Sequence, residues 1–174
     1  MALIKDARIV ADPWRSLADD EAMPNDRPVI VSWKRFRAER EAWIARGQPL
    51  GLRVPSEIPA SEIAAEIPHV ALIAIEFPKF TDGRAFSTAR LLRERHGFTG
   101  ELRAVGEVLR DQLLFMARCG FDAFAIADER AAAALGAFRE ITVAYQPAAD
   151  GTVPAFRRHG AGVAVARRAG HERR

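Results

Sequence analysis

The sequence predicts a single α/β domain built from repeated strand–helix units around a mainly parallel sheet, open or partly barrel-like. Short β-branched runs alternate with segments of helical periodicity, and each segment closes at glycine or proline. Residues 70–77 are almost wholly apolar, which is typical of a central strand covered on both faces. The chain has 174 residues and 49% of them are hydrophobic, which is enough for one sizeable core.

The elements follow in order along the chain. The first 27 residues form a lead-in, with a strand at residues 3–11 and then a long loop rich in turn formers and acids. Six core strands are expected at residues 28–32, 50–54, 70–77, 101–105, 123–127 and 141–145. Helices are expected at residues 33–46, 60–67, 85–96, 107–118 and 129–139, with Ser61 as a possible cap of the second. Because a closed parallel barrel needs eight strands, six favour an open or partly wrapped sheet.

The positive charge is concentrated at the C-terminal end. Residues 151–174 hold six arginines against one glutamate, whereas the rest of the chain is mildly acidic. From residue 148 the composition shifts to Ala, Gly and Arg, so we expect a domain over residues 1–147 and a flexible basic tail over residues 148–174. Nucleic-acid binding ranks last among the functions, because it requires basic groups organised around phosphates.

Several chemistries find no support in the sequence. The single cysteine, Cys119, excludes a disulfide or a CxxC pair within one chain, and the four histidines lack metal-ligand spacing. No metal site, nucleotide-binding motif or serine-hydrolase motif is evident, and no cofactor is implied. The charged N-terminus and the lack of a long apolar run lead us to expect a cytoplasmic protein without a membrane segment.

The loop after residues 70–77 is the strongest candidate site, since ligands of parallel sheets bind beyond the carboxyl ends of the strands. Its candidate anion ligands, with the start of the next helix, are Lys79, Thr81, Asp82, Gly83, Arg84 and Ser87. Cations, hydroxyls, a glycine and a helix start could together cradle a small oxyanion. The alternative, which the sequence favours slightly, is a turn at Asp82-Gly83 in which Asp82 caps the helix.

Arg103 lies within a predicted core strand, where a buried arginine needs a partner or an exit to water. It either joins the oxyanion clamp or forms a structural bridge to Glu76, Glu107 or Asp111, and the bridge is slightly favoured. Phe80, Asp111 and Gln112 are the candidates for a protein interface. The apolar, aromatic-rich segments around residues 33, 36 and 43 could form a homodimer face.

The chain resembles a bacterial family of unknown function (a DUF). The resemblance is carried by residues 76–87 (EFPKFTDGRAFS), 91–95 (LLRER), 100–106 (GELRAVG), 111–113 (DQL) and 118–124 (RCGFDAF). It extends from residue 4 to residue 147 and leaves out the basic tail. Members are commonly labelled probable oxidoreductases involved in sulfite reduction, and are typically encoded beside assimilatory sulfite reductase.

The resemblance implies a role in sulfur assimilation and cysteine biosynthesis. We expect an accessory protein that assists or binds sulfite reductase or its redox partner, with no standard catalytic motif of its own. The alternative is a small oxyanion-binding protein or enzyme that uses a Lys/Arg clamp.

Overall fold

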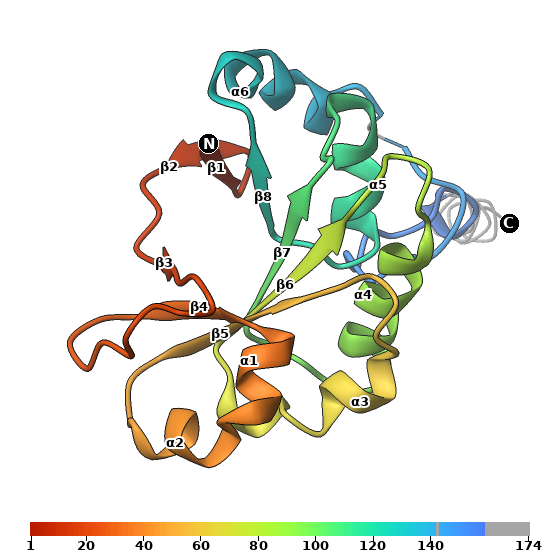
Figure 1. The fold of residues 1–174 in the computed structure, drawn as a ribbon. Helices are drawn as coiled ribbons and strands as arrows, with labels where there is room; N and C mark the ends of the chain where they lie inside the picture. The colour runs from red at the N-terminus through yellow and green to blue at the C-terminus, as the bar shows by residue number, and fades with distance from the viewer. Residues whose placement is uncertain (142, 159–174) are drawn as a thin grey trace, which may run out of the picture.

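The fold is a curled, mostly parallel sheet with helices packed along one side of it. The computed structural model describes residues 1–141 and 143–158 of the chain. Within these residues the sheet has eight strands in the order β2-β1-β8-β7-β6-β5-β4-β3. The sheet curls into a half-barrel, with the helices on its outer side and the open side between β2 and β3 (Figure 1). The predicted fold class is therefore confirmed.

The parallel part of the sheet runs from β3 to β8. Its strands are β3 (Arg15–Ser16), β4 (Val29–Ser32), β5 (Leu50–Val54), β6 (Leu72–Phe77), β7 (Glu101–Gly106) and β8 (Ala123–Ile126). The N-terminal pair, β1 (Ala2–Lys5) and β2 (Arg8–Val10), completes the sheet in antiparallel fashion beside β8. Since β4 to β8 all run the same way, the loops that follow them meet at one edge of the sheet.

The helices connect these strands. They are α1 (Trp33–Ala38), α2 (Arg40–Ala45), α3 (Ala60–Ala64), α4 (Arg84–Glu94), α5 (Leu113–Arg118) and α6 (Asp128–Ala134). Three short 3₁₀ segments accompany them, namely η1 (Ile67–His69), η2 (Arg110–Gln112) and η3 (Leu135–Arg139). None of the helices in the described part of the chain is long and apolar enough to span a membrane.

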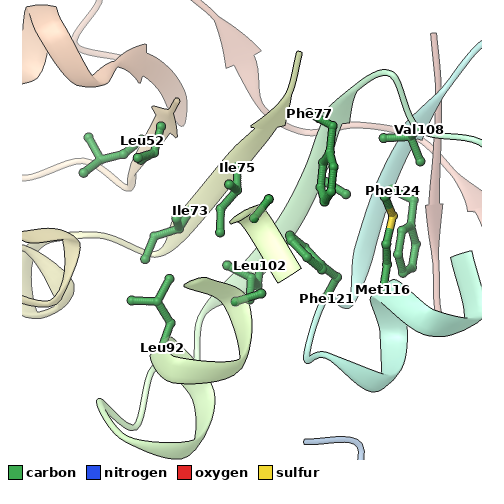
Figure 2. Close-up of a cluster of buried hydrophobic side chains, with 14 of the residues drawn as sticks. Leu52, Ile73, Ile75, Phe77, Leu92, Leu102, Val108, Met116, Phe121 and Phe124 are labelled. Carbon is green, nitrogen blue, oxygen red and sulfur yellow. The ribbon is translucent and has the colours of Figure 1, made fainter. Parts of the chain in front are cut away.

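Strand β6 is central and is covered on both faces, as its apolar sequence predicts. Ile73, Ile75 and Phe77 point toward the helices and pack with residues such as Leu92 of α4 (Figure 2). Alternate residues of β6 face the concave side, where Leu72 and Ala74 form a smaller cluster with Ile30. Trp14, from the loop that follows β2, packs against that cluster.

The lead-in is a hairpin rather than the single strand expected over residues 3–11. Asp6 and Ala7 adopt positive φ angles of 51° and 54°, and the chain reverses there between β1 and β2. Residues 33–46 likewise form two helices instead of one, because Glu39 leaves the helical region at φ −124° and ψ 28°.

Three further elements differ from the sequence-based expectation. Ser61 does not cap α3, because the helix already begins at Ala60 and its N-cap position is Pro59. The helix expected over residues 107–118 starts only at η2 and α5, since the chain leaves β7 through Gly106 at φ 93°. Residues 141 and 143–145 form no strand, and residue 142 lies outside the described residues.

The aromatic residues at positions 33, 36 and 43 are used within the chain. Trp33, Phe36 and Trp43 are all buried in the main core beneath α1 and α2. Their apolar surface is therefore not exposed for a second copy.

The chain beyond residue 147 contacts the domain as far as the structure describes it. The Ala149 amide donates to the Arg118 carbonyl over 3.0 Å, and the Ala155 amide donates to the Ala144 carbonyl over 2.8 Å. Ala155 is buried. Residues 159–174, which hold four of the six arginines of the predicted tail, lie outside the described residues.

Candidate functional site

The loop after β6 is held by one carboxylate. Asp82 accepts a hydrogen bond from the Ser56 hydroxyl over 2.7 Å, and Ser56 is only 3% exposed in the loop after β5. Asp82 also accepts from Arg84, through its backbone amide (3.1 Å), its Nε (2.9 Å) and its Nη2 (2.7 Å). This carboxylate therefore joins the loops of two neighbouring strands and binds the first residue of α4.

The charges of Asp82 and Arg84 neutralise each other. The Arg84 guanidinium, followed by the Ser56 hydroxyl, holds the pKa of Asp82 well below its usual range. In return, the hydrogen bond from Asp82 raises the pKa of Arg84. Arg84 Nη2 also donates to Ser56 over 3.1 Å, so three groups form one closed cluster. Both side chains are charged at every physiological pH.

The tip of the loop points outward. Lys79, Thr81 and Ser87 are exposed, and no hydrogen bond or ion pair joins their side chains to any part of the chain that the structure describes. Phe80 is 59% exposed, and its carbonyl accepts a hydrogen bond from Gln112 Nε2 over 2.9 Å. The Gln112 side chain therefore holds the loop beside the start of α5. Gly83 supplies the N-cap position of α4.

A row of aromatic rings runs from the core to the surface beside this loop. Phe121 and Phe77 have ring centroids 5.7 Å apart, Phe77 and Phe86 are 5.2 Å apart, and Phe86 and Phe115 are 5.0 Å apart. Figure 2 shows the first pair between β6 and the start of β8. The last ring, Phe115 of α5, is 57% exposed.

Phe80 and Phe115 thus lie on two segments that Gln112 holds together. With the exposed charges of Lys79 and Asp111 they make up what we call the Phe80–Phe115 surface. The ring of Phe115 packs on Phe86, and the backbone of Phe80 is bonded to Gln112.

Arg103 lies elsewhere, on the concave face of the sheet. It pairs with Ala74 in the β6–β7 register, three residues before the end of β6, which is roughly 10 Å from the loop. Its guanidinium donates to both oxygens of Asp12, over 2.6 Å and 3.0 Å, and contacts Glu101 Oε1 at 2.7 Å. Glu101 also accepts from Lys5 Nζ over 2.9 Å.

This geometry corrects the partners expected for Arg103. A bridge is present, but it connects to Asp12 and Glu101 rather than to Glu76, Glu107 or Asp111. Burial opposes the charge of Arg103, yet the bonds with the two carboxylates outweigh it and raise its pKa. Arg103 therefore does not join Lys79 and Arg84 in one clamp.

Neither a reactive cysteine nor a metal-binding cluster is found among the described residues. Cys119 is buried at the end of α5, and this burial raises the pKa of its thiol, which disfavours the reactive thiolate. No group of three or more His, Cys, Asp or Glu side chains in residues 1–141 and 143–158 could hold a metal ion.

The fold and this edge of the sheet define a curled α/β half-barrel with an aromatic surface beyond its central strand. Residues 51–156 match the family described as bacterial protein of unknown function (DUF934). The chain belongs to this family, and the match includes the whole Phe80–Phe115 surface. Comparisons with curated proteins and with solved structures gave no match.

Proposed function

We propose that this protein is an accessory factor of assimilatory sulfite reduction, in cysteine biosynthesis, that binds sulfite reductase or its redox partner through the Phe80–Phe115 surface. One observation carries the docking part. The charges of Asp82 and Arg84 are bonded inside the loop, whereas Phe80 and Phe115 stay 59% and 57% exposed. Exposed aromatic side chains are enriched at the centres of protein interfaces.

The order of Phe115 and of the Phe80 backbone supports this proposal. The backbone of Phe80 is fixed by Gln112, and the ring of Phe115 packs on the half-buried Phe86. Because the Phe115 ring is already packed, it loses little conformational entropy on binding, so more of its contact energy remains as affinity. The pathway part of the proposal depends on the resemblance to proteins labelled as acting in sulfite reduction.

Co-purification tests the docking. A tagged chain should co-purify with sulfite reductase subunits from cells grown on sulfate. The double variant Phe80→Ala/Phe115→Ala should lose these subunits, because both large contact groups are removed and neither is buried. The matched control is Leu91→Ala, an exposed apolar residue on α4, which should retain them.

Growth tests the pathway separately. A deletion strain should grow on sulfide and fail on sulfate or sulfite as the sole sulfur source. The proposal is wrong if the deletion strain grows normally on sulfite and no reductase subunit co-purifies.

A direct oxyanion clamp is the weaker candidate. Arg103 is neutralised on another face of the sheet, and Arg84 is paired with Asp82. Among the side chains of the expected ligands, only those of Lys79, Thr81 and Ser87 then remain exposed without such a partner in the described part of the chain. Calorimetric titration with sulfite, sulfate and phosphate tests this alternative, which requires binding by the wild type that Arg84→Ala weakens.

A further inference from the structure

A pocket of about 350 Å³ lies between the η2–α5 segment and the chain from η3 onward. Asp111, Leu114, Phe115 and Arg118 line one wall. Their spacing of three, four and seven residues places all four on one face of the η2–α5 segment. Phe138 and Ile141 belong to the opposite wall. Figure 1 shows α5 beside the segment that follows η3.

The middle of the pocket is apolar. Leu114 and Phe115 face Phe138 and Ile141 across it, and both Phe115 and Ile141 are exposed in the structure. The volume lies at the lower end of the range for small-molecule sites, about 300–1,000 Å³, which are mostly apolar with a few placed polar groups. The walls therefore suit one aromatic ring or a short alkyl chain.

The charges around the pocket leave one carboxylate free. Arg118 contacts Asp150 at 3.5 Å and donates to the Gln146 carbonyl over 2.5 Å. Glu140, also in the lining, is paired with Arg110. Asp111 has neither an ion pair nor a hydrogen bond to any residue in the described ranges. One end of the pocket is therefore negative.

We propose that this pocket binds a small organic cation with an apolar body. The cationic group pairs with the Asp111 carboxylate, and the body lies between Phe115 and Phe138. The face of Phe115 adds attraction for a cation close to its ring. The pocket shares Asp111 and Phe115 with the Phe80–Phe115 surface. Binding of a small cation by the isolated chain nevertheless does not require the role in sulfite reduction, so the two proposals can fail separately.

Three probes of one shape and different charge test the proposal by calorimetry on the full chain. They are phenethylamine, which is a cation, 2-phenylethanol, which is neutral, and phenylacetate, which is an anion. We expect saturable binding of the amine, about tenfold tighter than that of phenylacetate, because the charge at Asp111 attracts the one and repels the other. The alcohol should lie between them.

Two variants locate the site. Asp111→Asn should abolish the preference for the amine, and Phe115→Ala should weaken all three probes, since it removes one wall. The matched control is Glu62→Gln on α3, an exposed acid outside the pocket, which should leave the preference unchanged. Absence of amine binding, equal affinity for the three probes, or an unchanged preference in Asp111→Asn would each overturn the proposal.

Discussion

Replacing Asp12 by alanine should destabilise the whole fold, although Asp12 lies outside every regular element. Its carboxylate holds Arg103 through two hydrogen bonds, and Arg103 is buried on the concave face of β7. After the substitution, Glu101 would be the remaining carboxylate partner of this guanidinium, and Glu101 is already shared with Lys5. Part of a buried positive charge would then be uncompensated.

The size of the loss follows from the exposure of the partners. Removing one member of a fully buried pair costs about 3–5 kcal/mol. Because the Asp12 side chain is 38% exposed and Glu101 stays in place, we expect a loss of about 2 kcal/mol. Urea titration measures it as a lower midpoint with an unchanged slope. The control is Asp26→Ala, which removes an exposed pair with the neighbouring Arg27 and should leave the midpoint unchanged.

A double-mutant cycle makes the test specific to the ion pair. In the background Arg103→Met the substitution Asp12→Ala should have little further effect, because the charge it compensates is gone. The reasoning is refuted if Asp12→Ala leaves the midpoint of the wild type unchanged, or if the loss is the same in both backgrounds.

Three further predictions concern the end of β7, the loop before α4 and the end of α5. Gly106→Ala should lower the free energy of unfolding by more than about 2 kcal/mol, because the φ of Gly106 is 93° and the new Cβ would lie 2.5 Å from the Phe77 carbonyl oxygen. The control is Gly83→Ala, whose new Cβ would lie in open space and which should leave the urea midpoint almost unchanged. The folded-state pKa of Asp82 lies below its unfolded value of about 3.9. The difference in the free energy of unfolding between wild type and Asp82→Asn should therefore be full above that pH and shrink as the pH falls. A difference that grows in acid contradicts this linkage. Cys119 should react with a thiol reagent only after denaturant is added, and rapid reaction of the folded protein would show that it is not buried.

The parallel strands β4 to β8 were predictable because each has a local signal in the sequence, whereas β3 lies in the expected loop. β5 occupies the predicted residues 50–54. β6 was predicted from a nearly continuous apolar run, which is typical of a strand covered on both faces. The hairpin turn at Asp6 and Ala7 gave no such signal, since alanine at positive φ is uncommon and no glycine marks the reversal. The sequence does not indicate the break between α1 and α2 at Glu39 either, because glutamate is an ordinary helix former.

The position of the candidate site was predictable, but the partners of its residues were not. Strand polarity places the loop of Lys79 and Phe80 at the carboxyl edge of β6. Asp12, one of the two partners of Arg103, is in contrast 91 residues away in a loop without periodicity, and Ser56 is 26 residues from Asp82. Only the strand register decides which of these distant groups meet.

Those partners determine what the loop can bind. Asp82 stays ionised at physiological pH and remains bonded to Arg84, so an oxyanion approaching Arg84 meets a neutral pair that includes a fixed negative charge. Lys79 alone offers an exposed cation at the loop tip, and a single exposed lysine gives little affinity for a small ion. The same lysine beside Phe80 and Phe115 suits a larger partner, which can bury the two rings and place an acidic side chain against the ammonium at the rim. The loop is therefore better suited to recognise a protein surface than a free anion.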